Sequence, residues 1–595
     1  ETGQIKGDKV AKGAVGLSSS VAQKSDDEKE DTDMTSASST KGIEKTLKQI
    51  ELDESNTIQQ DVEQSLAETH DDKLSFREKL TVLNYPDAVA QFPCEPVLLS
   101  LYTNRFMAIV EQMCQILQRT STSVNIKQRL DFSCALFTQN GDLVQSGPNL
   151  PVHLGSLSTA VKAQIDLIND PTNPYGGWND GDVIVTNDPR LGGSHLPDIT
   201  VVSPVCAPFE LFPQEMQQQI RQHPNSTCYP LFFLVARGHH SELGGIAPAS
   251  MPSYSRLLCE EGVVISSYKI VQGVGSKLTS NLVQNGEKID LSQPYFDEKG
   301  FTALLLRPSP CGHPDCVGSR NIYDNLNDLR AQIAANNRGI RLVKQLVIDQ
   351  GVNKIISYMF HIQNTSEQSA RELLKNAAKT YFYQQRASQH KRSPQQSPYS
   401  PSQLPEIVNL PCTVDYMDDG TAIQLQVSIN TRTGDARFDF SGTGPNVLGN
   451  TNAPLSVVRS AIIYCIRVMV EHNATNQAKL QQLEESESTS GDKHKPKVHN
   501  TNIPLNQGLL IPVTIIIPPN TLLSPHPKLG VVGGNVLTSQ RITDVILYAF
   551  QIAANSSGCM NNFSFGSKDN KPAPPPQQSL FADDNQKVPP NSATQ

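Results

Sequence analysis

The sequence predicts an α+β fold of mixed helices and short strands, with disordered N- and C-terminal tails. Some segments carry apolar residues at helical spacing, whereas others are short β-branched runs bounded by turn residues. These segments do not follow the strand–helix–strand alternation of a doubly wound parallel sheet. Both ends of the chain are polar and contain few residues that a core would need.

The N-terminal tail is predicted from its charge and composition. Residues 1–80 of the 595-residue chain contain 18 Asp or Glu and 11 Lys or Arg, so they carry a net charge of −7 (11 less 18) out of −9 for the whole chain. No aromatic residue precedes Phe76. Because such a stretch buries too little apolar area to offset its conformational entropy, residues 1–85 are expected to be a disordered acidic tail or linker.

The rest of the chain excludes two classes of partner. Its net charge is only −2 (−9 less −7), which gives no electrostatic footprint for nucleic acid. It has no run of about 18 or more apolar residues, so no segment is expected to span a membrane. The 11 cysteines are dispersed and odd in number, which is typical of a reduced, cytoplasmic protein rather than of a disulfide scaffold.

For the first part of the folded body the sequence predicts two helices, a hairpin and two buried strands. Apolar residues recur at helical spacing over residues 97–120 and again over 154–168. An Asn-Gly pair at 140–141 joins two apolar runs, which is a strong hairpin signal. Short β-branched runs at 183–186 and 199–205 predict buried strands.

The second part predicts a further strand, two helical regions and a group of short strands. The apolar run 231–236 predicts a strand, and the periodicity of residues 320–380 and 538–554 predicts helices. Residues 408–440 change to short strands separated by Gly-containing turns, and the β-branched run 509–517 predicts another strand.

The folded body is expected to extend over residues 86–566, with polar stretches that interrupt and follow it. These stretches are rich in Gln, Ser, Pro or charged residues and show no apolar periodicity, so they are expected to be surface insertions, linkers or a disordered tail. They lie at about residues 206–229, 384–403, 472–501 and 567–595.

Chemically capable side chains are densest at the ends of two predicted strands. His195 and Asp198 stand three residues apart, and the run Arg237-Gly-His239-His240-Ser-Glu242 follows an apolar strand. Imidazole nitrogen and carboxylate oxygen are ligands of Zn, Mn and Fe, and three protein ligands leave a position for water or substrate. The same residues could instead form structural His–Asp hydrogen bonds, so the residues alone leave both interpretations open.

Other reaction classes have less support. The chain has no Gly-x-x-x-x-Gly-Lys-Ser/Thr phosphate loop and no Ser or Cys in a nucleophile elbow. Arg119 and Arg129 could bind a substrate carboxylate, because a guanidinium fork matches a carboxylate, but each could equally be a surface charge.

Several motifs, in order along residues 96–566, resemble the hydantoinase B/oxoprolinase family. Taken together they are specific, and the run Pro504-Leu-Asn-Gln-Gly508 is most similar to the eukaryotic ATP-dependent 5-oxoprolinases of that family. The other motifs include Asn125-Ile-Lys-Gln-Arg-Leu-Asp-Phe-Ser-Cys-Ala135, Pro151-Val-His-Leu-Gly-Ser156, Gly192-Gly-Ser-His-Leu-Pro-Asp198, Arg237-Gly-His-His240, Asp324-Asn-Leu-Asn-Asp-Leu-Arg-Ala-Gln-Ile-Ala-Ala-Asn336 and Gly534-Asn-Val-Leu-Thr-Ser-Gln-Arg541.

The resemblance implies a two-part enzyme of glutathione metabolism. In such enzymes a hydantoinase A-type half uses ATP to phosphorylate the lactam oxygen of 5-oxo-L-proline, and the B-type half hydrolyses the activated ring to L-glutamate. This chain would be the B-type portion, in a homo-oligomer. It would use a divalent metal (Mn, Zn or Mg), and ATP would bind an A-type half that this chain does not contain.

The resemblance also implies roles for individual residues. Related acetone-carboxylase-type α subunits hold a metal at the positions of His195, Asp198 and His240. Glu242 would be a catalytic base, although family members usually carry Asp there, and Arg119 or Arg129 would bind the substrate. Further catalytic candidates, each of which could instead orient a neighbour, are His153, Asp188 and His239.

Two departures from the family leave alternatives open. No ATP-binding half precedes residue 96, and the family continues beyond the region where this chain becomes Pro-rich, so the chain is expected to be part of a longer polypeptide. One alternative is a hydantoinase- or carboxylase-type relative that acts on another lactam or ketone. The other is a catalytically silent scaffold subunit.

Overall fold

The computed structural model describes residues 85–556, apart from 148, 175, 213, 277–282, 285–286, 289–292, 309, 393–403 and 471–504. The predicted tails and the predicted insertion at 472–501 lie outside these residues, except for Tyr85 at the end of the N-terminal stretch. The described part mixes helices with largely antiparallel sheets, which confirms the α+β class.

A seven-stranded antiparallel sheet forms the centre of the first lobe. The predicted hairpin and the three predicted buried strands all belong to it. Its strands, in spatial order, are β2 (Leu143–Ser146), β1 (Phe132–Thr138), β5 (Cys228–His239), β4 (Asp198–Pro208), β3 (Val183–Thr186), β6 (Tyr268–Gln272) and β9 (Tyr295–Phe296).

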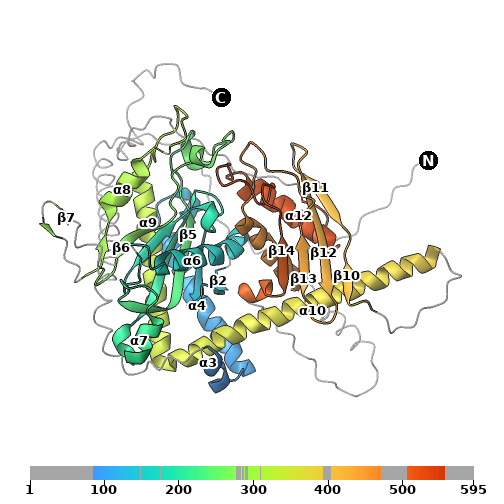
Figure 1. Cartoon of the computed structure of the whole chain (residues 1–595), viewed down its shortest axis with the longest axis horizontal. Coiled ribbons are helices and arrows are strands. Elements are labelled where there is room, and N and C mark those ends of the chain that lie inside the picture. Colours follow the sequence, from blue (N-terminus) through green and yellow to red (C-terminus); the bar gives the residue numbers. More distant parts are fainter. Residues whose placement is uncertain are drawn as a thin grey trace, which may run out of the picture. The chain divides into compact units, whose positions relative to one another are not determined.

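Helices cover both faces of this sheet (Figure 1). On one face α9 (Ile322–Gln350) packs against the central strands β5 and β4, and α4 (Pro96–Thr120) packs against β1 and β2. On the other face lies α6 (Leu154–Asn169). Leu234 and Ala236 of β5 therefore belong to one core cluster, whereas Phe233 and Val235 belong to another. Because both faces are buried, these strands are apolar at nearly every position.

Shorter elements complete the first lobe. They lie before or between its main strands and helices along the chain. They are α3 (Tyr85–Gln91), α5 (Val124–Lys127), η2 (Pro151–His153), η3 (Pro189–Leu191), η5 (Pro248–Ser250), η6 (Leu258–Glu260), β7 (Val283–Gln284), β8 (Glu287–Lys288) and α8 (Glu298–Leu306).

The predicted insertion at 206–229 is partly ordered. It contains η4 (Phe209–Leu211) and α7 (Gln214–Ile220), and a disulfide joins Cys206 to Cys228 at its two ends. The pairing of β4 with β5 brings these two cysteines, 22 residues apart in the sequence, close together. The other described cysteines form no disulfide.

The second lobe contains a five-stranded sheet that packs against helices. Strand β12 (Ala422–Asn430) alternates buried and half-buried residues, which is the pattern of a strand with one covered face. The predicted strand at 509–517 is instead a 3-10 turn, η8 (Gln507–Leu510), followed by a shorter strand. The other elements are β10 (Ile407–Asn409), β11 (Thr413–Tyr416), β13 (Ala436–Asp439), β14 (Val513–Ile516), a helix at 455–470, the π-turn η9 (Gly534–Thr538) and α12 (Ser539–Ala549).

The long helix α10 (Val352–Arg392) belongs to both lobes (Figure 1). Its first turns contribute Ile355 and Ile362 to the core of the first lobe, and later turns contribute Leu373 and Leu374 to that of the second. Residues 384–392, expected to lie in a polar linker, are its last turns. Helix propagation from a packed segment overrides their polar composition.

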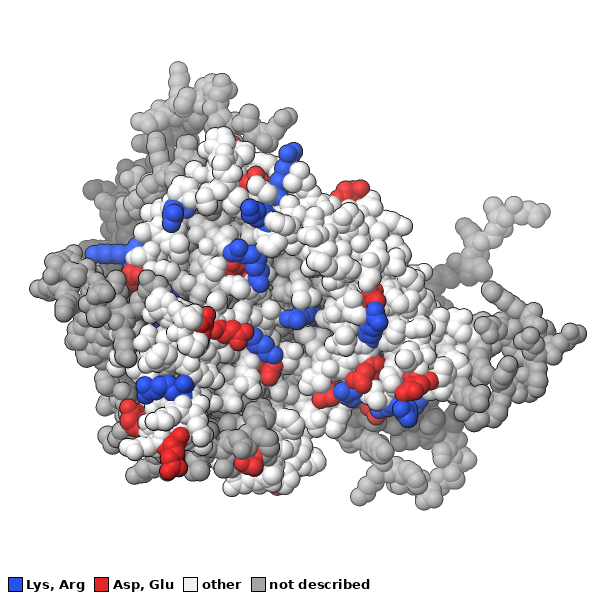
Figure 2. All heavy atoms as spheres, in the orientation of Figure 1, with Lys and Arg blue, Asp and Glu red and all other residues white. Residues whose placement is uncertain are grey.

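Two surface features bear on function. Figure 2 shows acidic and basic side chains interspersed on the visible face, without a large patch of one sign.

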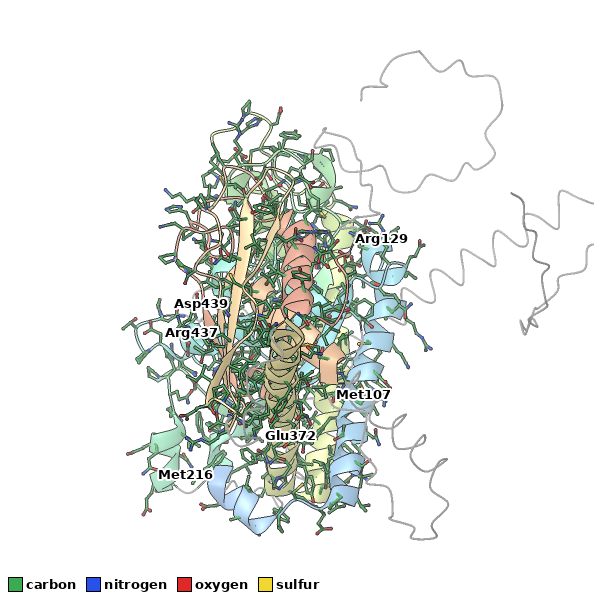
Figure 3. The ribbon with its side chains drawn as sticks, turned by 90° about the vertical axis from the view of Figure 1, so that its right-hand side faces the viewer. Met107, Arg129, Met216, Glu372, Arg437 and Asp439 are labelled. Carbon is green, nitrogen blue, oxygen red and sulfur yellow. A yellow bond between two sulfur atoms is a disulfide. The ribbon has the colours of Figure 1, made fainter. Side chains whose placement is uncertain are left out.

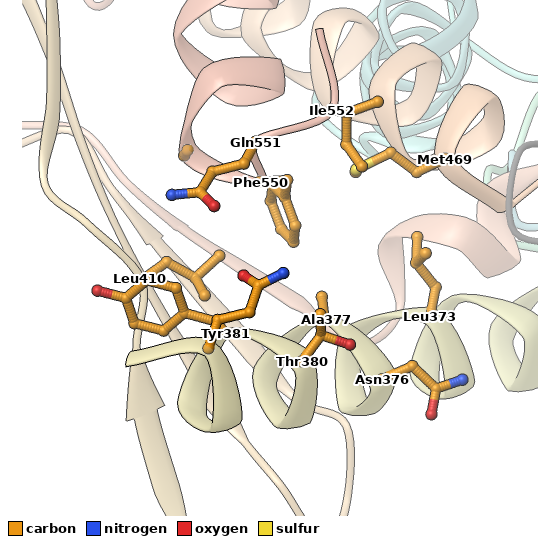
Figure 4. Close-up of a pocket in the computed structure, with 12 residues that line it drawn as sticks. Leu373, Asn376, Ala377, Thr380, Tyr381, Leu410, Met469, Phe550, Gln551 and Ile552 are labelled. Carbon is orange, nitrogen blue, oxygen red and sulfur yellow. The ribbon is translucent and has the colours of Figure 1, made fainter. Parts of the chain in front are cut away.

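A cavity of about 220 Å³ lies between α10 and the segment after α12 (Figure 4), and the only ionisable side chain that lines it is that of Tyr381. No described helix is long and apolar enough to cross a membrane.

Gly192, at the end of η3, packs against α6. Its φ is +95°, and an added Cβ would lie 2.3 Å from the Ala160 nitrogen. We expect Gly192→Ala to lower the free energy of unfolding by about 2–5 kcal/mol, from backbone strain plus overpacking. Gly420→Ala is the matched control, because Gly420 has a φ of +85° but open space around it, and should cost only about 1–2 kcal/mol. Urea unfolding of both variants measures the difference, and equal losses would contradict this packing.

Candidate functional site

The site residues lie at one edge of the seven-stranded sheet, where three strands begin or end. β4 starts at Asp198 and β5 ends at His239, and these two residues are paired in the antiparallel ladder. Asp131 directly precedes β1, the other neighbour of β5, and its carbonyl accepts the His239 N–H at 3.0 Å. The strand register therefore brings residues from three distant segments side by side.

The Asp198 carboxylate is surrounded by imidazoles. Its Oδ1 lies 3.1 Å from His195 Nε2 and 3.4 Å from His239 Nδ1, and its Oδ2 lies 3.3 Å from His153 Nε2. Asp131 Oδ2 lies 3.6 Å from His239 Nδ1. We call these five residues the His–Asp cluster. All of them are buried except Asp131, which is half-buried.

Hydrogen bonds set the tautomer of His195. Its Nδ1 lies 3.3 Å from the Val532 carbonyl oxygen, to which it donates, and the amide Nδ2 of Asn535 donates to Nε2 at 3.3 Å. Nε2 also lies 3.1 Å from Asp198 Oδ1, which has no hydrogen-bond partner among the described residues. A neutral imidazole in this tautomer cannot donate to that oxygen, so a proton or a metal ion at Nε2 would satisfy both atoms.

The electrostatics of the cluster favour an ionised Asp198. Burial opposes ionisation, but the positive charges that His195 and His153 carry when protonated outweigh it and hold the pKa of Asp198 well below its usual range. Burial also acts to lower the pKa of His239, but the carboxylates of Asp131 and Asp198 raise it overall.

Arg237 adds a buried positive charge. It is fully buried in β5 and donates hydrogen bonds to Thr200 Oγ1, Ser156 Oγ and the Gly192 carbonyl. Burial lowers its pKa to about 10, against the opposing influence of Asp198. Arg237 therefore remains a cation at neutral pH and stabilises the buried carboxylate.

The donor set fits a divalent cation. Two groups of ligand atoms each lie within 4.8 Å of one another, and both include Asp198. Two carboxylates with three neutral imidazoles carry a charge of −2, which a divalent ion would neutralise. The two groups are His195, Asp198 and His239, and Asp131, His153 and Asp198.

His240, the predicted third ligand, belongs to neither group. Its Nε2 donates to Gln332 Oε1 at 2.9 Å, because the Gln332 amide nitrogen already donates to the Ile199 and Ala236 carbonyls. The side chain that lies beside Asp198 in this run is that of His239, the last residue of β5. The role of His240 as a metal ligand stays a prediction.

The two other predicted carboxylates are engaged elsewhere. Glu242 accepts hydrogen bonds from Arg320 at 3.0 Å and from two backbone N–H groups of the 244–249 loop. Burial raises its pKa even though Arg320 opposes this shift. Asp188 caps η3 and binds Arg190, and its hydrogen bonds lower its pKa despite burial. Neither residue is part of the His–Asp cluster.

Of the two predicted arginines, Arg129 is the one near the cluster. Its positive charge acts to lower the pKa of His239, and its exposed side chain donates to Asn125 Oδ1 at 3.4 Å (Figure 3). Arg119 lies in the last turn of α4, and no ion pair or side-chain hydrogen bond among the described residues links it to the cluster.

Sequence reasoning missed Asp131, Gln332 and Asn535 as site residues. All three lie inside the motifs that carry the family resemblance. Asp131 directly precedes the buried strand β1, and a carboxylate at the start of a strand is a signal that could have found it. Nothing in the local sequence distinguishes Gln332 or Asn535 from structural amides.

The fold and the cluster define a protein with a candidate metal site at the edge of a helix-covered antiparallel sheet. The hydantoinase B/oxoprolinase family model matches residues 95–486 and 495–582, so the chain belongs to this family. The chain is 41% identical to 5-oxoprolinase 1 of Arabidopsis thaliana over 80% of its length, and 37% identical to the 5-oxoprolinase of Saccharomyces cerevisiae, again over 80%. It spans 31% and 29% of these two relatives.

More distant relatives share the fold. The crystal structure of the ATP-dependent caprolactamase from Pseudomonas jessenii matches 78% of this chain, and 61% of its own chain, at 20% identity and a TM-score of 0.51. The beta subunit of caprolactamase from the same organism is 24% identical over 48% of this chain and 40% of the subunit.

The ion pair of Glu242 with Arg320 predicts a stability effect. Both side chains are more than nine-tenths buried, so Arg320→Met leaves a buried carboxylate without its counter-charge and should cost about 3–5 kcal/mol. Arg432→Met breaks the exposed pair with Glu406 and should cost at most about 1 kcal/mol. Chemical denaturation compares the two, and a small effect of Arg320→Met would return Glu242 to the list of catalytic candidates.

Proposed function

We propose that this chain is the B-type part of a 5-oxoprolinase-type enzyme. It would carry out the hydrolytic ring opening of 5-oxo-L-proline to L-glutamate, together with an A-type half that binds ATP. The support is family membership and the identity of 37–41% to proteins named 5-oxoprolinase. Assembly into a homo-oligomer, a cytoplasmic location and a place in glutathione metabolism stay predictions of the sequence.

The observation that carries the chemistry is that Asp198 Oδ1 accepts no hydrogen bond among the described residues, yet lies within ion-pair distance of His195 Nε2 and His239 Nδ1. We assign His195, Asp198 and His239 as the residues that would hold a divalent cation of the Mn, Zn or Mg type. Such a cation, when bound, lowers the pKa of a water molecule and polarises a carbonyl oxygen.

The surrounding residues would perform the remaining steps. His153 is held by Ser133 Oγ at 2.9 Å and orients Asp198 through Oδ2. Asp131 has a side chain that is 27% exposed at the edge of the cluster, so it can accept a proton from the attacking water. Arg129 is exposed near His239 and can bind the substrate carboxylate. Glu242 has no proposed catalytic role, because Arg320 and the 244–249 loop already occupy it.

The cation assignment predicts different effects for the two adjacent histidines. His195→Ala and His239→Ala should each weaken Mn²⁺ or Zn²⁺ binding by more than about 100-fold, because loss of a ligand costs more than loss of a ligand's hydrogen-bond partner. His240→Ala should weaken it by less than about 10-fold. Calorimetric titration of the purified chain measures these affinities.

His526→Ala is the control for this titration, because His526 is exposed and outside the cluster. Equal binding by all variants would favour the scaffold alternative. Loss of binding in His240→Ala with normal binding in His239→Ala would restore the ligand set expected from the sequence.

The substrate assignment predicts a selective effect at Arg129. With the A-type half supplied, Arg129→Met should raise the KM for 5-oxo-L-proline by about 10- to 100-fold, because one charged hydrogen bond to the carboxylate is lost. The same variant should leave the KM for a lactam without a carboxylate unchanged. Arg119→Met is the matched control and should change neither value. Steady-state kinetics with ATP test this, and the chain without an A-type half should show no ATP-dependent turnover.

The relationship to a caprolactamase beta subunit keeps another lactam as the second candidate substrate. Faster turnover of a neutral lactam than of 5-oxo-L-proline by the wild-type protein would favour that alternative.

A further inference from the structure

The His195 ring contacts a segment of the second lobe through Val532 and Asn535. Val532 lies just before η9 and Asn535 lies within it, more than 300 residues along the chain from His195. Nothing in the first sheet contributes these contacts. The orientation of His195 therefore depends on how residues 531–535 are held against the first lobe.

Glu261 of the first lobe holds this segment. Its Oε1 accepts hydrogen bonds from the backbone N–H groups of Val531 at 2.9 Å and Val532 at 3.1 Å, and from Ser255 Oγ at 3.1 Å. The Glu261 side chain is fully buried, and its Oε2 has no partner among the described residues. One carboxyl oxygen thus satisfies two buried backbone donors of another lobe.

We infer that Glu261 is a positioning residue that sets the tautomer and orientation of His195 through Val532. The N–H and the C=O of Val532 flank the same Cα. Glu261 binds the first and His195 Nδ1 donates to the second. While Glu261 holds Val532, the Val532 carbonyl faces Nδ1, and His195 Nε2 stays directed at Asp198. This inference rests on the proposed cation site.

The role needs an acceptor oxygen and not a negative charge. Burial raises the pKa of Glu261 to about 8, so the carboxyl group is largely neutral at pH 7. A neutral carboxyl group and an amide each present one carbonyl oxygen of the same reach, so Gln can replace Glu here. A side chain of similar length without an acceptor, such as Met, cannot.

The test is a titration of Mn²⁺ or Zn²⁺ into the full chain carrying Glu261→Gln, Glu261→Met or Ser255→Ala. Glu261→Met should weaken cation binding by about 10- to 100-fold, which is the usual effect of losing a residue that orients a ligand. Glu261→Gln and Ser255→Ala should stay within about 3-fold of wild type. A folded Glu261→Met protein that binds the cation as tightly as wild type overturns the inference, and so does a Glu261→Gln protein as weak as Glu261→Met.

Hydrogen exchange of the Val531 and Val532 amides gives a readout that needs no cation. We expect exchange at least about 10-fold faster in Glu261→Met, and rates near wild type in Glu261→Gln. If Glu261→Met does not fold, Glu261→Ala replaces it in both measurements. A wild-type chain that binds no cation would overturn the proposed function, whereas unchanged exchange in the variant without an acceptor would overturn the role of Glu261.

Discussion

The buried Asp198 carboxylate is the constraint on which the rest of the site depends. A carboxylate without solvent is stable only when charges and hydrogen-bond donors surround it. Ser194 donates to its Oδ2, His153 lies beside the same oxygen, and Arg237 supplies a buried positive charge. These groups leave Oδ1 to face His195 and His239, where the proposed cation would complete the charge balance.

Helix α9 holds together the strands that end at this edge of the sheet. Gln332 and Asn336 lie one turn apart on its buried face and donate to backbone carbonyls of β4 and β5. Each buried amide thereby ties the helix to strands that end at the site. A buried amide N–H₂ group is costly unless it donates hydrogen bonds, and here both groups donate to the strands that carry Asp198 and His239.

The location of the cluster also bears on the proposed reaction. Asp131, the half-buried member of the cluster, and the exposed Arg129 near it are the accessible residues, so substrate would approach from their side. The guanidinium proposed to bind its carboxylate and the proposed proton acceptor both lie there. His153 and Asp198 lie further inside and would keep their geometry throughout. An unactivated five-membered lactam is a poor electrophile, which gives the proposed ATP-binding half its role.

Much of the fold followed from local patterns. The periodicity over residues 97–120 and 154–168, the Asn-Gly hairpin, the apolar run after Asp198 and the one before His239 each reflect a preference that neighbours in the sequence decide. Predictions from local composition were wrong where packing overrode it. Residues 384–392 are helical, and the 509–517 run starts with a 3-10 turn.

The amino-acid pattern alone shows that imidazoles and carboxylates gather at the ends of buried strands. It does not show that His239 lies beside Asp198, that Asp131 joins them, or that Arg320 engages Glu242, because these contacts form only in the assembled fold. A strand pattern shows which residues alternate but not which strand lies beside which. The register of β4 with β5 places Asp198 opposite His239, and register is a property of the assembled sheet.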